Sequence, residues 1–463
     1  MSNEKGEIIL ASRNTLDMTS GPIFRKLLLF AYPLMINSIV NTLYNIADKI
    51  IAGQYIGDGA IAAVGACAPP INLLVNTVIA IASGGSVLCG NFIGARKDKE
   101  LRECMHCIPV AGALFGFLLC LVGLLCGKPL LMAMDSPESI LADAYLYMSV
   151  RMLGMIFGIT NSFCVTIFTA HGDTKRITLS GLLSGLLNVL GNLFFVIVIP
   201  MGIAGIALAT VLSQVLALGI KIIILFSNKD SYRLQFKALR IYPQHLVQIF
   251  RIGIPTGINS VCFSLSNVIL QSSVNSFGTT VITGNSGADT IAELVALFPS
   301  RMNEACSCAV AQCFGAKNFP RIKETVRKAL FGTVAMTVLS SAVVTVFATP
   351  IMKLFTDSAT VAQAGIPKLM FTNWGYVIYV FSLIYAGSLK GIRHSGVTML
   401  LNVVGICLPR VLWVWFVFPF FNTPTMLYMI YPISYLISAV LLGIAYRIKL
   451  KSHIQMHTET LTA

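Results

Sequence analysis

The sequence predicts an all-α integral membrane protein with twelve transmembrane helices in two pseudo-symmetric six-helix bundles. Composition, the spacing of apolar segments and an internal repeat lead to this prediction. Of 463 residues, 56% are hydrophobic and 11% are charged, whereas roughly a quarter of the residues in a soluble domain are charged. The net charge of +14 would indicate nucleic-acid binding in a soluble chain. In a membrane chain the positions of the charges matter more, so we expect lipids and not nucleic acid as partners.

The apolar segments recur at roughly the length needed to cross a bilayer. Turn-forming stretches such as Gly57-Asp58-Gly59 and Pro200-Met201-Gly202 separate them. The expected spans cover residues 23–51, 63–89, 106–126, 139–168, 176–199, 202–226, 247–276, 280–313, 328–348, 362–389, 396–418 and 424–446.

The basic residues are distributed asymmetrically among the loops. Most of the 33 Lys and Arg residues lie in the N-terminal segment, in the loops after even-numbered spans or in the C-terminal tail. The opposite loops hold Lys128, Lys353 and, near a span boundary, Lys368. By the positive-inside rule, both termini are expected in the cytoplasm, with the protein in the bacterial inner (cell) membrane.

An internal repeat divides the chain into two halves. Tyr32-Pro33-Leu34-Met35-Ile36-Asn37-Ser38 matches Ile254-Pro255-Thr256-Gly257-Ile258-Asn259-Ser260, and Gly94-Ala95-Arg96 matches Gly315-Ala316-Lys317. With six spans each, the halves run in the same direction, an arrangement on which alternating access is built. We expect a cytoplasmic segment at 1–21, lobes at 22–226 and 247–446, a linker at 227–246 and a tail at 447–463.

The first span carries a polar face that ends in a carboxylate. Its members are spaced three and four residues apart on one helical face: Asn37, Asn41, Tyr44, Asn45 and Asp48. An intramembrane carboxylate is costly and is a candidate functional residue. The aligned positions of the second half, Ile269 or Leu270, are apolar. Neighbouring Lys49 is expected to point elsewhere.

Other polar residues of the first half are expected to face Asp48. They lie on the fourth, fifth and sixth spans: Asn161, Ser184, Asn188, Asn192, Thr210 and Gln214. Such an oxygen-rich pocket would hold an exchangeable proton or a hard cation such as sodium. The alternative is an interhelical hydrogen-bond cluster.

The second half has its own polar residues. Asp289, Glu293 and Glu304 share a face of the eighth span, which also holds Arg301, and Arg410 is a candidate partner. Two interpretations stay open, an acidic lining for an organic cation and an internal salt-bridge network. The tenth span adds aromatic and amide side chains that would stack on a cation or simply pack: Asn373, Trp374, Tyr376 and Tyr379. The candidate substrate pathway comprises Asn37, Asn41, Asp289, Glu293, Tyr376 and Tyr379.

Enzyme motifs are missing from the sequence. There is no GxxxxGK[ST] phosphate loop, no GxSxG and no HExxH. Cys104 and Cys107 form a lone CxxC without a second pair of ligands. We therefore expect no enzyme, no cofactor and no metal apart from sodium as a coupling ion.

These residues resemble the multidrug and toxic compound extrusion (MATE) family, in its bacterial DinF-like and MepA-like branch. The resemblance rests on several motifs in order: Pro33 with Asn45-Ile46-Ala47-Asp48, Gly94-Ala95-Arg96, Gly202-Ile203-Ala204-Gly205, Gly315-Ala316-Lys317, Arg410-Val411-Leu412-Trp413 and Tyr431-Pro432-Ile433-Ser434. It implies a V-shaped antiporter that exports cationic drugs in exchange for protons or sodium. It places the coupling site at Tyr44, Asp48, Asn161, Asn188, Asn192 and Thr210.

One position departs from the family pattern. Related members place an aspartate where this chain has Asn192, so Asp48 is the only acid of the expected pocket. Protonation of Asp48 is then the simpler cycle, and sodium coupling remains open. We expect a monomer that takes small cationic substrates. A lipid-linked precursor flippase of the same superfamily is the alternative, and a membrane enzyme or receptor is a weaker one.

Overall fold

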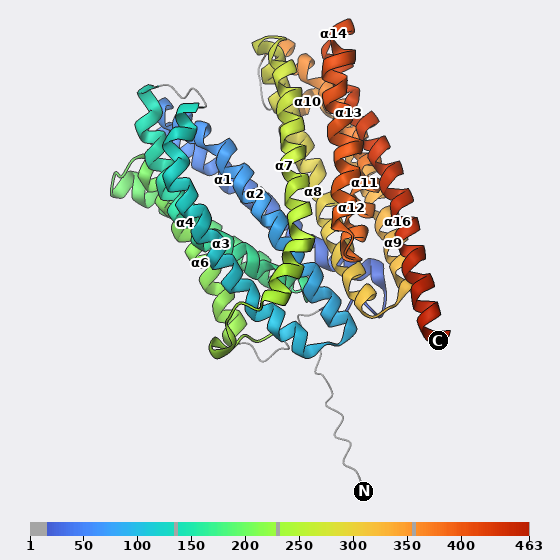
Figure 1. The fold of residues 1–463 in the computed structure, drawn as a ribbon. Helices are drawn as coiled ribbons and strands as arrows, with labels where there is room; N and C mark the ends of the chain where they lie inside the picture. Colours follow the sequence, from blue (N-terminus) through green and yellow to red (C-terminus); the bar gives the residue numbers. More distant parts are fainter. Residues whose placement is uncertain (1–15, 134–137, 228–231, 354–357, 463) are drawn as a thin grey trace.

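The protein is described by a computed structural model over residues 16–133, 138–227, 232–353 and 358–462. Helices account for nearly all of these residues, and no strand occurs among them. Two bundles stand side by side, the first half of the chain in one and the second half in the other (Figure 1). The all-helical prediction is thus confirmed.

Six long helices build the first bundle. These are α1 (Ile23–Tyr55), α2 (Asp58–Ala95), α3 (Asp98–Ala133), α4 (Glu138–Ala170), α5 (Thr174–Leu193) and α6 (Ile203–Ser227). The π-helical turn η1 (Phe194–Val198) extends α5 directly after Leu193 and begins two residues beyond Asn192. Asp173 caps α5, because its side chain accepts a hydrogen bond from the Arg176 amide.

The second bundle begins after the short 3₁₀ turn η2 (Phe236–Ala238). It holds α7 (Pro243–Asn275), α8 (Thr279–Gly315), α9 (Phe319–Val346), α10 (Ala348–Lys353) and α11 (Ala359–Gly391). One interrupted helix follows as α12 (Ser395–Asn402), η3 (Val403–Cys407), α13 (Leu408–Leu412), η4 (Trp413–Val417) and α14 (Phe418–Phe421). The chain ends with α15 (Pro424–Tyr428) and α16 (Ile430–Thr462).

The internal repeat is visible in the backbone. Gly57 and Gly278, which precede α2 and α8, both have positive φ, at 116° and 84°. Arg96 and Lys317, which follow the same two helices, are both left-handed with φ of 54°. Corresponding turns in the two halves therefore have corresponding conformations, as the sequence repeat predicts.

Eleven helices of the described residues are long and apolar enough to cross a membrane. The sequence predicted twelve, and α8 makes the difference. It has 37 residues and packs against α2, α9 and α11 like its neighbours. Its acidic and basic side chains lower its hydropathy, so it depends on protein contacts more than on lipid.

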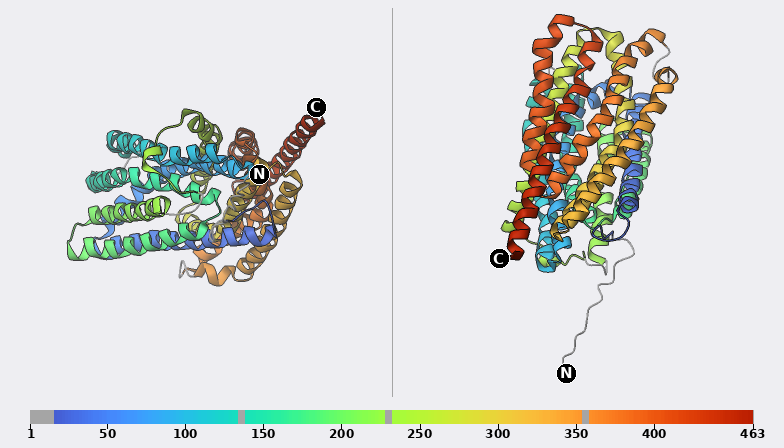
Figure 2. Two further views of the ribbon diagram at one scale, coloured as in Figure 1. Left: turned by 90° about the horizontal axis from the view of Figure 1, so that it is seen from below. Right: turned by 90° about the vertical axis from the view of Figure 1, so that its right-hand side faces the viewer.

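The bundles meet at the end that carries the basic loops and diverge toward the other end (Figure 1). A view from the meeting end shows the two sets of helices side by side (Figure 2). At this end the contact between α2 and α8 is backbone to backbone. A Cβ on Gly94 would lie 1.8 Å from the Gln312 carbonyl oxygen, and one on Gly315 would lie 1.9 Å from that of Asn91. Glycine at both repeated positions therefore permits the close approach.

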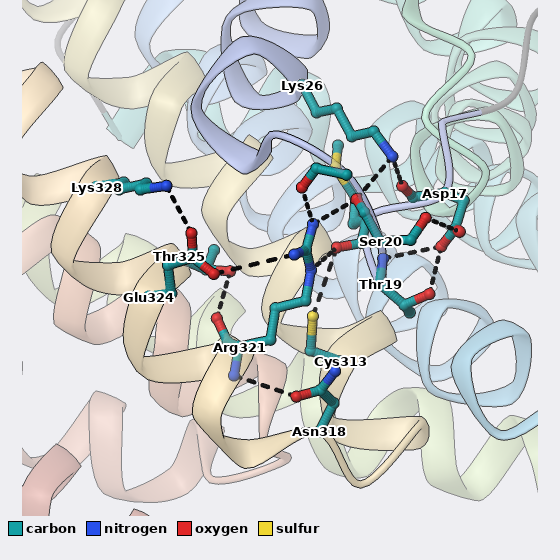
Figure 3. A network of polar contacts seen from close by, with 12 residues as sticks. Asp17, Thr19, Ser20, Lys26, Cys313, Asn318, Arg321, Glu324, Thr325 and Lys328 are labelled. Atoms are coloured by element: carbon teal, nitrogen blue, oxygen red, sulfur yellow. Dashed lines mark hydrogen bonds and ion pairs between the residues drawn. The ribbon is translucent and has the colours of Figure 1, made fainter.

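The segment before α1 connects the bundles at the same end. The Leu16 amide donates to the His171 carbonyl of the first half. The Met18 amide donates to Gln312 Oε1 of the second half at 2.8 Å. Arg321 at the start of α9 donates to the carbonyls of Met18, Ser20 and Gly21. Figure 3 shows this guanidinium in the bend of the segment.

Candidate functional site

The polar face of α1 packs against α5. A Cβ on Gly181 would lie 1.8 Å from Asn37 Oδ1, and one on Gly185 would lie 1.4 Å from the Tyr44 ring. The Tyr44 hydroxyl lies 3.3 Å from the Gly181 and Leu182 carbonyl oxygens. The two glycines of α5 therefore make room for two side chains of α1.

The predicted polar face divides in two. Asn37, Tyr44 and Asp48 lie within about 40° of one another around the helix, and all three contact α5. Asn41 and Asn45 lie to one side of that seam and are exposed. Asn37 and Asn41 were both expected in the substrate pathway. Asn37 packs between α1 and α5, whereas Asn41 is exposed. The Lys49 side chain lies outside the described residues.

Asp48 and Asn192 contact each other where α1 packs on α5, close to the end at which the two bundles diverge. Asn192 Nδ2 donates a hydrogen bond to Asp48 Oδ1. Asn192 is fully buried, whereas Asp48 is half-buried. Asp48 lies seven residues before the end of α1, so this pair is nearer to the diverging end of the bundles than to the basic loops.

A positively charged side chain lies within electrostatic range of this carboxylate. The charge of Arg151 on α4 acts on Asp48 and on the Tyr147 hydroxyl. Arg151 Nε is buried and has no hydrogen-bond partner among the described residues. Arg151 was not among the residues predicted for the site, although an arginine inside an expected span was the signal that could have identified it.

Three asparagines of the expected pocket have a buried side-chain oxygen that accepts no hydrogen bond from the described residues. These acceptors are the Oδ1 atoms of Asn161, Asn188 and Asn192. Asn188 Nδ2 lies 3.4 Å from Thr210 Oγ1, which itself donates to the Ile206 carbonyl. The structure thus joins Asp48 to Asn192 and Asn188 to Thr210. Ser184 instead donates to the Gly181 carbonyl of its own helix.

This set of atoms suits a small cation or a proton donor. Carboxylate, amide and hydroxyl oxygens are the ligands of hard cations, and an unsatisfied buried acceptor gains a partner when a donor enters. Arg151 offsets the negative charge of Asp48, which reduces the attraction of the pocket for a bare sodium ion. The arrangement can exchange a proton at Asp48 while the Asn192 amide holds the side chain in place.

In the second half, the acids pair differently from the expectation. Asp289 Oδ2 accepts from Lys368 Nζ at 2.6 Å, and Arg301 pairs with Glu304 at 2.9 Å. The expected partnership of Asp289 with Arg410 is therefore wrong. Lys368 was expected near a loop, but it lies in α11 with 3% of its surface exposed, so Asp289 supplies the opposite charge that a buried ammonium needs.

Arg410 is fully buried in a group of aromatic rings. Its guanidinium carbon lies 5.0 Å from the ring centroids of Phe263 and Tyr431 and 5.4 Å from that of Tyr435. Nη1 donates to Asn267 Oδ1 at 2.7 Å. Nη2 is buried and has no hydrogen-bond partner in the part of the chain that the structure describes. The partners of Arg410 are therefore aromatic rings and the Asn267 amide, in place of the carboxylate predicted from the sequence.

The aromatic residues of α11 belong to the same group. The Tyr379 and Tyr435 ring centroids are 4.4 Å apart, and those of Tyr376 and Tyr435 are 6.2 Å apart. Their near neighbours pack toward α9, where Asn373 Nδ2 donates to the Ser341 carbonyl and Trp374 Nε1 to Thr345 Oγ1. Tyr376 and Tyr379 therefore stack on other tyrosines, and Glu293 on α8 is exposed.

A comparison with family models matches the MatE family twice, at residues 33–194 and 255–415. The two matches fall on the two halves of the internal repeat. Probable multidrug resistance protein YoeA of Bacillus subtilis is 26% identical over 395 residues, covering 83% of this chain and 84% of that protein. Multidrug export protein MepA of Staphylococcus aureus is 20% identical over 395 residues, covering 85% and 87%.

Solved structures share the fold. An outward-facing multidrug resistance MATE family transporter of the MOP superfamily superposes with a TM-score of 0.86 at 21% identity, covering 95% of this chain and 98% of that one. A MOP superfamily transporter from Pyrococcus furiosus, described as having a binding pocket of reverse polarity, superposes with a TM-score of 0.86 at 20% identity, covering 94% and 98%.

Proposed function

This chain belongs to the MatE family, a family of membrane transporters and not of enzymes, and from that premise we propose that it exports small organic cations in exchange for protons. The observation that carries the proposal is the Asp48 carboxylate, held by Asn192 beside buried amide oxygens without donors. Relatives named as multidrug resistance and multidrug export proteins support the substrate class.

The proposed cycle uses the position of Asp48 near the diverging end. A proton from outside reaches the carboxylate and neutralises it, which removes its attraction for Arg151. The first bundle then repacks, releases the drug outside and allows the bundles to close there. A bound ion shifts such an equilibrium only by its difference in affinity for the two arrangements. Asp48 must therefore hold the proton more tightly in one arrangement than in the other.

Proton coupling is proposed in preference to sodium coupling. Asp48 is the one carboxylate of the pocket among the described residues, and the charge of Arg151 acts against its negative charge. The experiment is transport by the purified chain in liposomes, with proton and sodium gradients imposed separately. We expect an acidic vesicle lumen, from which protons flow outward through the transporter, to drive uptake of a cationic dye into inside-out vesicles. Transport driven by sodium alone would reject proton coupling, and transport under neither gradient would reject antiport.

A second candidate has an observation of its own. Lys368 and Arg410 are two buried cations in the second bundle, and cations favour substrates that carry a phosphate or carboxylate. A lipid-linked precursor flippase would need such groups. Movement of a fluorescent anionic lipid across the liposome bilayer, with no transport of a cationic dye, would favour that function.

A further inference from the structure

Two adjoining cavities lie where the bundles meet. One has a volume of about 440 Å³ and the other about 600 Å³. Both are lined by Gln248, Phe314 and Arg393, so together they form one recess between α2, α7, α8 and the turn before α12. This recess is at the end of the molecule opposite to the outer Asp48 pocket.

The lining of the recess is cationic. Two arginines, Arg251 and Arg393, supply the positive charge of the larger cavity, and no carboxylate of the described residues lines it. His394 and His453 also line it, with their Nε2 atoms 3.0 Å apart, and burial lowers the pKa of His394. The smaller cavity has Lys97 and one acid, Glu100, which are paired at 3.6 Å. Within the described residues, neither Arg251 nor Arg393 forms an ion pair. Two arginines on the wall of one cavity without counter-charges repel each other unless an anion enters.

Arg393 is held with its donors available. Its Nε donates to Asn91 Oδ1 at 2.6 Å, and its guanidinium carbon lies 5.9 Å from the Phe92 ring centroid. Asn91 in turn donates to the Ala311 and Gly391 carbonyls, both at 3.2 Å. The remaining N–H groups of Arg393 have no protein partner among the described residues. A guanidinium fixed in this way is preorganised for a planar two-point contact with an anion.

We propose that this recess binds a phosphate group, as carried by an anionic lipid headgroup or by free phosphate. Arginine forks match phosphate oxygens with two parallel hydrogen bonds. Basic recesses between helices at the cytoplasmic end are places where anionic headgroups bind. Each cavity volume exceeds that of one phosphate group, which leaves room for the glycerol part of a headgroup.

The bound phosphate would stabilise the arrangement in which the bundles meet at this end. Arg393 of the second half contacts Asn91 and Phe92 of α2 in the first bundle, and it shares the larger cavity with Arg251 of α7. An anion held by the two arginines would fix Arg393 in the position from which it contacts α2, and this contact is lost when the bundles separate here. The site depends only on the fold and does not require the proposed substrate or coupling ion.

The test uses the full chain in nanodiscs of phosphatidylcholine, with or without phosphatidylglycerol, and measures thermal unfolding. We expect phosphatidylglycerol to raise the unfolding temperature of the wild type. Arg251→Gln should lose most of that shift. Arg393→Gln should also lose most of the shift in unfolding temperature, but this substitution breaks the hydrogen bond to Asn91 as well. If the Arg393 variant folds poorly, the result for Arg251→Gln decides whether the recess binds phosphate. Arg327→Gln is the matched control, because this exposed arginine of α9 lines neither cavity.

A second arm separates the sources of the phosphate. Inorganic phosphate is titrated into protein in phosphatidylcholine nanodiscs. A shift produced by phosphatidylglycerol and lost only in the recess variants supports a lipid ligand, and the same pattern with inorganic phosphate supports a soluble one. If neither probe gives a shift, or if Arg251→Gln and Arg327→Gln respond alike, the recess is not a phosphate site. These experiments measure unfolding temperature and not transport. A negative result would therefore reject the phosphate site without bearing on the proposed transport function.

Discussion

Asn192 Nδ2 donates a hydrogen bond to Asp48 Oδ1 across the α1–α5 seam. The two residues are 144 positions apart in the chain, and each lies near the outer end of its helix. The charge of Arg151 on α4 also acts on this carboxylate. Neutralising Asp48 would change its interactions with both neighbours, which links protonation to the packing of α1, α4 and α5.

Asp48→Asn should abolish drug-dependent proton flux in proteoliposomes. The amide keeps the size of the side chain but cannot exchange a proton at this site. Asp143→Asn, on the exposed surface of α4, is the matched control and should transport like the wild type. If the Asp48 variant still exports drug against a gradient with coupled proton movement, the role assigned to this residue is wrong.

Asn192→Asp should increase the response to sodium. It places a second carboxylate next to Asp48, and a bound sodium ion would then be balanced by two charges. We expect sodium to bind about tenfold more tightly, which requires only about 1.4 kcal/mol. The measurement is the sodium-dependent rise in unfolding temperature. Asn45→Asp is the control, because it adds the same charge on the exposed side of α1 and should leave the sodium response unchanged. An equal sodium response in both variants would show that Asp48 and residue 192 do not form a cation pocket.

Gly94→Ala should open the end at which the bundles meet. The new Cβ would lie 1.8 Å from a backbone carbonyl oxygen of α8, so the two helices must move apart. Buried Cys313, also on α8, should then react faster with a maleimide, as measured by mass spectrometry. Gly219→Ala is the control, since open space surrounds that position. Unchanged labelling of Cys313 in the Gly94 variant would show that this contact does not hold the end closed.

Arg321→Gln should release the segment before α1. The guanidinium donates to three carbonyls of that segment (Figure 3), and we expect amide hydrogens at residues 16–21 to exchange faster in the variant. Arg327→Gln on the same helix is the control. Exchange rates that are equal in the two variants would mean that the segment is held by its other contacts.

The same segment should be insensitive to mild acid. Burial raises the pKa of Asp17, but hydrogen bonds from Thr19 and Ser20 and the charge of Lys26 outweigh burial and lower it below the ordinary value. A lowered pKa stabilises the folded segment above the unfolded value, about 3.9, and this contribution disappears as the pH falls through the folded value. Protection of residues 16–21 should therefore persist from neutral pH to about pH 4 and decline below it.

Sequence reasoning predicted those parts of the structure that depend on local periodicity. Helical spacing placed Asp48 on a polar face of α1 and Asn192 on a polar face of the fifth span, and the family resemblance named both as members of one site. Pairings in the second bundle depend instead on how distant helices pack. Nothing in the local sequence indicates that Lys368 turns inward to Asp289, or that aromatic rings surround Arg410. The low hydropathy of α8 has the same basis, because Asp289 of this helix is paired with Lys368 of α11, a partner that the hydropathy of one helix does not include.

Asp289→Asn should destabilise the second bundle through Lys368. The ammonium is 3% exposed and would lose its 2.6 Å partner. Removing one member of a buried pair costs about 3–5 kcal/mol. We expect a loss of stability at the lower end of this range, because 47% of the Asp289 side chain is exposed and solvent weakens such ion pairs. The measurement is the loss in unfolding temperature in detergent.

The double variant Asp289→Asn with Lys368→Met distinguishes the two interpretations of this acid. If the pair only supports packing, the double variant should recover most of the lost stability, since no buried charge is left alone, and it should also recover drug export. If Asp289 contacts the cationic substrate, stability should return while the KM for the drug stays raised. A double variant as unstable as Asp289→Asn alone would contradict both, because the cost would then not arise from the isolated ammonium of Lys368.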